Sequence, residues 1–229
     1  MAQALRSTVM AALPRRLLST AGLARGQWRG YQYTVGASGI PELHRHATTI
    51  LCVRKEGRLC MIGDGQATQG SMIKKPNAKK VRRLSPNVVA GFAGSTADCM
   101  SLMDRLENKL EEYPGQLLRA SVELAKLWRL DRYLRHLEAV LIVADENIAL
   151  EVTGNGDVLE SHDGVLAVGS GSVYALAAAR ALVPFEELSA RDCAERAMQI
   201  AGDMCTGTNH QFVIEEIGPE TIANSKEEK

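Results

Sequence analysis

The sequence has no excess of charge of either sign. Its 229 residues include 27 Lys and Arg and 27 Asp and Glu, which gives a formal net charge of zero. Proteins that bind nucleic acid or anionic membrane surfaces usually carry an excess of positive charge, so this composition supports neither function. The sequence also has no apolar run of about 20 residues, the length that a membrane-spanning helix needs. We therefore expect one sizeable globular domain with no nucleic-acid partner and no membrane partner.

Paired cysteines and zinc motifs are also missing. The five cysteines are odd in number, and no two of them form a CxxC motif. Four lie inside apolar patterns: Cys52, Cys60, Cys99 and Cys193. This usage favours reduced, buried thiols in a non-secreted compartment over a disulfide framework. His44 and His46 lie two residues apart, but no nearby cysteine or pair of carboxylates completes a zinc site around them.

Acidic residues are absent from residues 1–41, and the first is Glu42. The same stretch contains five arginines and much Ser, Thr, Ala and Leu. A segment rich in Arg and free of acids is typical of a mitochondrial transit peptide, whereas a tail without function is the alternative. We expect residues 1–47 to be a transit peptide or propeptide that is removed. Residues 48–217 then form the domain, residues 218–229 form a polar tail, and the protein resides in the mitochondrial matrix.

Glycine clusters in the sequence do not match nucleotide-binding motifs. GSGSVYALAAA (169–179) follows a predicted strand and opens a predicted helix, but the third glycine of a dinucleotide fingerprint is missing. GDGQATQG (63–70) lacks the Lys-Ser/Thr pair of a Walker loop. The short basic run KKVRR (79–83) has no interleaved aromatic residues and is typical of a solvated strand edge. We expect no nucleotide site in this chain.

Apolar periodicity predicts an α+β fold. Strand patterns and helix patterns are segregated along the chain rather than alternating, which argues against a parallel sheet. TTILCV and AVLIVA are apolar on both faces, as expected for strands covered on both sides. We expect two stacked sheets flanked by helix pairs. The predicted strands are 48–53, 59–64, 71–84, 87–94, 138–145, 148–153, 157–161, 164–171 and 210–217. The first predicted helix follows the cap-like segment 95–98 and ends near Pro114, and the others are 117–134, 172–182 and 189–205.

The pair Thr48–Thr49 lies where the leader composition ends and the first apolar strand begins. A threonine hydroxyl is a poor nucleophile without an adjacent base. Cleavage between Ala47 and Thr48 would free an α-amine, whose ordinary pKa is about 7.7–8.0, as that base. A neighbouring ammonium would favour its neutral form, a role that we assign to Lys80. Threonine at the start of a strand is also common without any catalytic role, so the residues alone leave both interpretations open.

Several motifs in one order resemble the HslV (ClpQ) family of proteasome-like threonine peptidases. They are TTILCVRKEG, MIGDGQATQG, NAKKVRRL, VVAGFAGSTAD, LEAVLIVAD, TGNGDV, AVGSGSVYALAAARAL and GDMCTGTNH. The resemblance extends from about Thr48 to about Ile217. It implies the N-terminal nucleophile hydrolase fold, a four-layer αββα sandwich. The Arg-rich leader indicates a eukaryotic, mitochondrial form.

The resemblance also implies the site residues. Thr48 would be the nucleophile after removal of residues 1–47, with Lys80 beside its amine and Asp64 holding the lysine and the amine. Ser170 would relay a proton near the amine, and the backbone N–H of Gly91 would bind the oxyanion. The family binds a monovalent cation, Na⁺ or K⁺, through backbone carbonyls. The matching positions are Gly202, Cys205 and Thr208.

The family resemblance further implies a threonine endopeptidase that works with a partner. Members assemble as two stacked hexameric rings and receive unfolded protein substrates from an HslU (ClpY)-type AAA+ ATPase hexamer. ATP would be used by that partner and not by this chain. Two alternatives remain: a catalytically silent, structural ring subunit, and a small-amide N-terminal hydrolase that works without an unfoldase.

Overall fold

The computed structural model describes residues 24–28, 31–35, 41–43, 48–69, 72–94, 96–131 and 139–219, and it divides into two compact units, Met1–His44 and Arg45–Lys229. The first unit contains a small antiparallel sheet of strands β1 (Ala24–Trp28), β2 (Tyr31–Val35) and β3 (Pro41–Leu43), in that order. The sequence patterns did not predict these strands.

The second unit contains the domain predicted from residue 48 onward. Its strands are β4 (Thr49–Lys55), β5 (Arg58–Asp64), β6 (Ala67–Gln69), β7 (Met72–Lys75), β8 (Val81–Ser85), β9 (Val88–Gly94), β10 (Ala139–Ala144), β11 (Ala149–Thr153), β12 (Val158–Glu160), β13 (Val165–Gly169) and β14 (Phe212–Ile217). Its helices are α1 (Thr96–Glu112), α2 (Leu117–Leu130), α3 (Ser172–Leu182) and α4 (Ala190–Met204).

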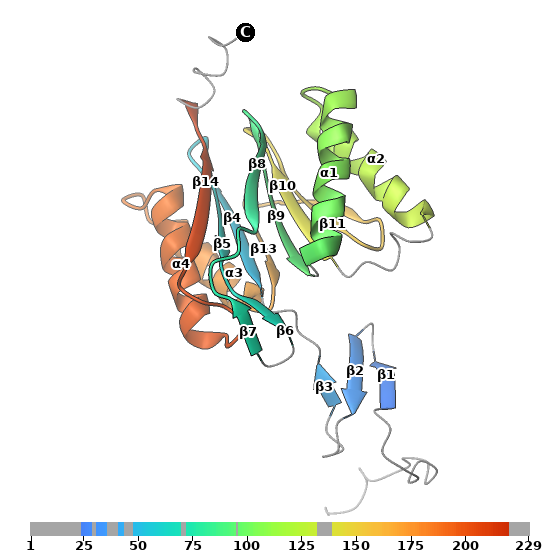
Figure 1. Ribbon diagram of the computed structural model, residues 1–229. Coiled ribbons are helices and arrows are strands. Elements are labelled where there is room, and N and C mark those ends of the chain that lie inside the picture. Colours follow the sequence, from blue (N-terminus) through green and yellow to red (C-terminus); the bar gives the residue numbers. More distant parts are fainter. Residues whose placement is uncertain are drawn as a thin grey trace, which may run out of the picture. The chain divides into compact units, whose positions relative to one another are not determined.

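Two antiparallel sheets stack face to face between two helix pairs (Figure 1). One sheet has the order β13-β4-β5-β14 and packs against α3 and α4. The other has the order β12-β11-β10-β9-β8 and packs against α1 and α2. A third apolar cluster lies between the sheets. The predicted four-layer αββα sandwich is therefore confirmed.

Strand β4 shows why its sequence is apolar on both faces. Ile50 and Cys52 point into the cluster between the sheets, whereas Leu51 and Val53 point toward α3 and α4. Successive side chains of a strand alternate between faces, so a strand in an inner layer needs apolar residues at every position. All five cysteines are buried and none forms a disulfide, which confirms the predicted buried thiols. Burial raises the pKa of the Cys52 thiol to about 12.

The β4–β5 hairpin sets the register on which the site depends. Its turn residues Glu56 and Gly57 both have positive φ (52° and 73°), as a type I′ turn requires. From this turn the pairing runs from Lys55 opposite Arg58 to Ile50 opposite Gly63. Thr49 therefore lies next to Asp64 at the open end of the hairpin.

Two predicted elements differ from the structure. The predicted strand 71–84 is divided into β7, which pairs with β6 as an exposed ribbon, and β8, with irregular backbone from Pro76 to Lys80 between them. Pro76 interrupts the strand because proline has no N–H to donate to a neighbouring strand. Two residues later, Ala78 N donates to Gly65 O at 2.8 Å, outside any strand pairing. The predicted second helix ends at Leu130, and residues 132–138 lie outside the described residues.

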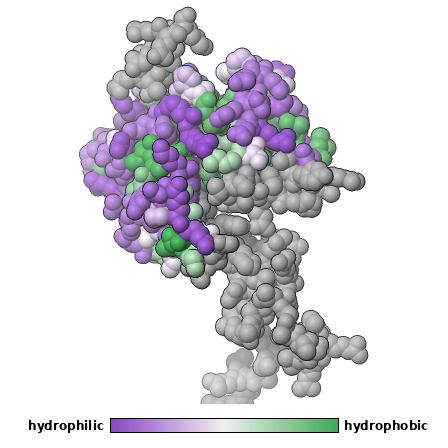
Figure 2. All heavy atoms as spheres, viewed as in Figure 1, coloured by the Kyte–Doolittle hydropathy of each residue, from purple (hydrophilic) through white to green (hydrophobic). Residues whose placement is uncertain are grey.

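Figure 2 shows a largely hydrophilic face with separate, small hydrophobic patches. Large exposed apolar side chains include Met72 and Ile73 on β7 and Val173 on α3. None of the described helices is long and apolar enough to cross a membrane.

Candidate active site

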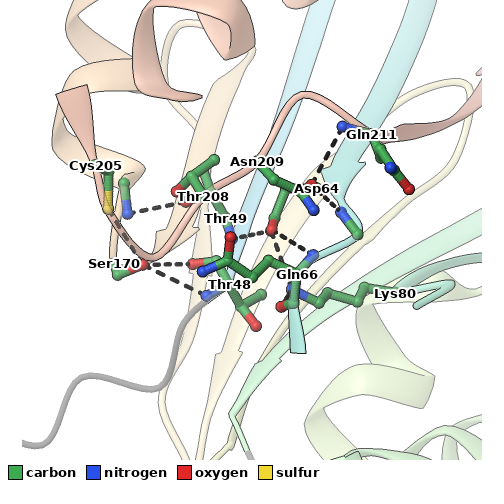
Figure 3. A network of polar contacts seen from close by, with 12 residues as sticks. Thr48, Thr49, Asp64, Gln66, Lys80, Ser170, Cys205, Thr208, Asn209 and Gln211 are labelled. Carbon is green, nitrogen blue, oxygen red and sulfur yellow. Dashed lines mark hydrogen bonds and ion pairs between the residues drawn. The ribbon is translucent and has the colours of Figure 1, made fainter. Parts of the chain in front are cut away.

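The site forms where β4 begins, beside the end of β13. Thr48 immediately precedes β4 and is 3% exposed. Ser170 follows β13, and its backbone N–H donates to Thr48 O at 2.7 Å. Its hydroxyl lies 3.4 Å from Thr48 N and 3.3 Å from Thr48 O (Figure 3). The structure therefore brings together the predicted nucleophile and the predicted proton relay.

Gly169 explains the glycine-rich sequence before Ser170. It has φ +99°, and a Cβ at this position would overlap the carbonyl oxygen of Thr48. Only glycine allows this approach, because every other residue carries a Cβ and disfavours positive φ. The GSG motif therefore serves close backbone packing against Thr48, the predicted nucleophile.

Asp64 connects the start of β4 to Lys80. Its Oδ1 accepts from Thr49 N at 2.7 Å and from Lys80 Nζ at 3.0 Å, and its Oδ2 accepts from Gln66 N at 2.8 Å. Lys80 Nζ also donates to Gln66 O. Asp64 Oδ1 accepts from both Thr49 N and Lys80 Nζ. The Lys80 ammonium is therefore held close to the residue that directly follows Thr48.

The Lys80–Asp64 pair is buried, with side chains that are 5% and 0% exposed. Burial lowers the pKa of Lys80 below its ordinary value, because an ammonium is less stable away from water. The attraction and hydrogen bond of Asp64 act in the opposite direction and favour the charged form. A buried ion pair of this kind adds little net stability, which is consistent with a functional role.

Thr49, the residue after the predicted nucleophile, is hydrogen-bonded to Thr208 and Gly171. Thr49 Oγ1 accepts from Gly171 N at 2.9 Å and lies 2.7 Å from Thr208 Oγ1. Thr49 is fully buried and Thr208 is 4% exposed. These bonds join β4, the start of α3 and the loop after α4, so the residue that follows Thr48 is held from three sides.

The geometry is suited to N-terminal nucleophile chemistry. In the full chain Thr48 N belongs to the peptide bond with Ala47. If that bond is cleaved, Thr48 carries both a hydroxyl and an α-amine, which can take the proton of the hydroxyl. Ser170 Oγ already lies 3.4 Å from the nitrogen of that amine, and the Lys80–Asp64 pair is bound to the backbone N–H of the next residue, Thr49.

Gly91 does not belong to this network of polar contacts. It lies in the middle of β9, opposite Val81 and Ile142, and a Cβ there would come 2.6 Å from Ile50 Cγ2 and 3.1 Å from Met61 Sδ. The structure thus gives Gly91 a packing role between the sheets. Its role as oxyanion donor stays a prediction.

The predicted cation positions cluster at the end of α4. Gly202 lies in its last turn, Cys205 is its C-cap, and Thr208 N donates to Cys205 O at 3.0 Å. The last carbonyls of a helix have no partner within the helix and form the negative end of its dipole. Such oxygens fit an alkali cation. Among the described residues, no three His, Cys, Asp or Glu side chains group as they would for a transition metal.

Two residues that the sequence did not single out join the site. Gln66 follows the GDG motif, and its side chain donates to Thr206 O at 2.9 Å. Asn209 accepts from Gly65 N at 3.1 Å and donates to Pro76 O at 2.8 Å. Both lie inside motifs quoted above, but their contacts join segments about 140 residues apart. No local pattern could have revealed such contacts.

Comparisons with known proteins agree with this geometry. The family model of the proteasome subunit matches residues 44–217. Among solved structures, the chain is similar to eukaryotic HslV from Trypanosoma brucei, with 48% sequence identity and a TM-score of 0.72. The match covers 74% of this chain and 99% of that chain. The family resemblance seen in the sequence motifs is thus confirmed.

Proposed function

Because this chain belongs to the proteasome-subunit family and is an HslV-like N-terminal nucleophile peptidase, we propose that it is the proteolytic subunit of an ATP-dependent protease. In this proposal it is a threonine endopeptidase that begins at Thr48. The observation that best supports it is the shared carboxylate oxygen of Asp64, which holds both Thr49 N and Lys80 Nζ.

Catalysis would proceed by acyl transfer through Thr48. Its Oγ attacks the substrate carbonyl while its α-amine takes the hydroxyl proton, directly or through Ser170 or a water. The tetrahedral intermediate collapses to an ester, and the leaving amine receives that proton. Water then attacks the ester while the α-amine takes a proton from it. That proton passes to Thr48 Oγ as the ester bond breaks. The Lys80 ammonium keeps the α-amine neutral at neutral pH.

The proposed assembly consists of two stacked hexameric rings that work with an HslU-type AAA+ ATPase hexamer. HslV from Trypanosoma brucei is the relative that supports this assembly. Large apolar side chains exposed on the single chain, among them Val173 and Met204, are suited to burial between subunits. Unfolded proteins would be delivered by the partner, which would use the ATP. We place the protein in the mitochondrial matrix on the composition of residues 1–41.

A monovalent cation, Na⁺ or K⁺, is part of the proposal. The carbonyl oxygens of Gly202, Cys205 and Thr208 would hold it, and it would supply positive charge at the negative end of α4. Thr208 connects this segment to Thr49 through its hydroxyl. The segment that would hold the cation is therefore also in contact with the residue after the nucleophile.

The proposal is tested on the protein purified from its native source and on recombinant protein that begins at Thr48. N-terminal sequencing and intact mass should show a chain that starts at Thr48, about five kilodaltons lighter than the full chain at roughly 110 Da per residue. Recombinant protein of this form should hydrolyse a fluorogenic peptide, and ATP with the AAA+ partner should extend hydrolysis to an unfolded protein.

Two control proteins complete this test. Thr48→Ala should assemble into rings without measurable turnover, and a form that retains Ala47 should also be inactive. Turnover in Thr48→Ala would exclude the proposed nucleophile. Intact rings without turnover in the unmodified mature protein would instead favour the silent ring subunit. Hydrolysis of small amides alone, unaffected by the AAA+ partner, would favour the small-amide hydrolase.

A further inference from the structure

Asn209 precedes β14 and has no role in the mechanism above, yet its side chain contacts three segments of backbone. Its Oδ1 accepts from Gly65 N at 3.1 Å and from Gln211 N at 3.2 Å. Its Nδ2 donates to Pro76 O at 2.8 Å (Figure 3 shows the two bonds of Oδ1). An amide has both a donor and an acceptor group, and here both are used on backbone atoms.

The hydrogen bond from Gly65 N to Asn209 Oδ1 lies next to Asp64. Gly65 follows Asp64 directly, and Gln66 N closes back onto Asp64 Oδ2 at 2.8 Å. The path of the chain through Gly65 therefore places Gln66 N against the Asp64 carboxylate. A Cβ on Gly65 would overlap Pro76 O and come 2.9 Å from Asn77 Cα, so these two stretches of backbone are in direct contact.

The hydrogen bond from Asn209 Nδ2 to Pro76 O holds the start of the segment that leads to Lys80. Residues 76–80 lie in neither a helix nor a strand, so no regular hydrogen-bond ladder fixes their path. The path is held at Pro76 O by Asn209, at Ala78 N by Gly65 O, and at Lys80 O by Phe92 N at 3.1 Å. Asn209 is the only side chain among these three partners.

We propose that Asn209 is a positioning residue that holds the Lys80 ammonium against Asp64 by fixing the backbone of Gly65 and Pro76 with one amide. The inference rests on the proposed function, in which Lys80 acts on the α-amine of Thr48. Asn209 itself does not touch the reacting atoms in this scheme. It acts through the backbone of Gly65, which follows Asp64, and of Pro76, which lies four residues before Lys80.

Loss of the amide should change the pH dependence of catalysis. If segment 76–80 moves, the Lys80 ammonium lies farther from the Thr48 amine and depresses its pKa less. The amine then loses its proton only at higher pH, so the acid limb of the rate profile moves to higher pH. A residue with a purely structural role would lower the amount of assembled protein without moving this limb.

The experiment compares Asn209→Ala and Asn209→Gln in the mature, assembled protein that begins at Thr48. Asn147→Ala is the matched control, because Asn147 is exposed on the β10–β11 turn and its side-chain amide donates to the adjacent Glu146 Oε1 at 3.5 Å. Light scattering measures assembly, and kcat, KM and the pH profile are measured with a fluorogenic peptide. Asn209→Gln keeps the amide but displaces it by one methylene, so it replaces Asn209→Ala if the latter does not assemble.

We expect Asn209→Ala to lower kcat/KM on the order of tenfold at neutral pH, mainly through kcat, with the acid limb at higher pH. Asn209→Gln should show the same direction with a smaller loss, and Asn147→Ala should match the unmodified protein. An assembled Asn209 variant with an unmoved acid limb, or with a change in KM alone, would overturn this inference. If the unmodified protein and Thr48→Ala were equally inactive, the proposed function would fail first, and this inference with it.

Discussion

The backbone N–H of Thr49 donates to Asp64 Oδ1 at 2.7 Å across the open end of the β4–β5 hairpin. The same oxygen accepts from Lys80 Nζ at 3.0 Å. One carboxylate atom thus joins the first residue of β4, which follows the proposed nucleophile Thr48, to the only buried lysine among the described residues.

Lys80→Ala should lower kcat/KM by about a hundredfold or more at neutral pH, because the Thr48 amine loses the ammonium that keeps it neutral. The Asp64 carboxylate would also be left buried without its counter-charge, which costs stability. Peptide hydrolysis by assembled protein, normalised to ring concentration, checks this. Lys79→Ala is the matched control, since Lys79 is the exposed neighbour, and near-normal activity in Lys80→Ala would mean that another cation serves the amine.

The rate of peptide hydrolysis should fall at alkaline pH, and this fall should begin at a lower pH than the titration of an exposed lysine would give. Burial lowers the pKa of Lys80 from its ordinary 10.5, so the ammonium loses its proton below that pH. Deprotonation removes the charge that the mechanism uses, and activity declines through the lowered pKa. Lys80→Arg stays charged, so whatever activity it retains should persist to higher pH. An alkaline limb at the same pH in both proteins would show that another group titrates.

Gly169→Ala should abolish most of the peptidase activity, because its Cβ would overlap Thr48 O and displace the nucleophile. Gly57→Ala is the control that shows the effect of backbone strain without the steric overlap. Gly57 also has positive φ (73°), but no atom lies within 4 Å of its would-be Cβ. It should cost roughly 1 kcal/mol of stability and leave kcat unchanged. Thermal unfolding and steady-state kinetics of both variants check the difference, and equal kinetic losses would contradict it.

Gly91→Ala should destabilise the domain by about 1–3 kcal/mol, because the added methyl enters the packed cluster between the sheets. Its nearest neighbour would be Ile50 Cγ2 at 2.6 Å. Denaturant unfolding measures the loss. In the double variant with Ile50→Ala the two losses should not add, since the second substitution makes room for the first. Strict additivity would indicate that the two residues do not compete for this space.

Much of the fold could be predicted because local patterns carry it. TTILCV is apolar at every position, and the structure divides its side chains between two apolar clusters. Thr48, Asp64 and Lys80 could be named from motifs because each lies in a characteristic short segment. Asn209 and Thr208 could not be assigned contacts, since their partners lie more than 130 residues away in sequence. The packing of Gly91 against Ile50 arises only when the two sheets stack.

The turn at Glu56 and Gly57 lies at the opposite end of the β4–β5 hairpin from Thr48. Side chains alternate between the faces of a sheet, so one inserted residue in either strand would send Asp64 to the wrong side of its neighbours. The length of this hairpin is therefore as much a requirement of the chemistry as any single side chain. Natural variation in loop length should therefore be rare at this turn.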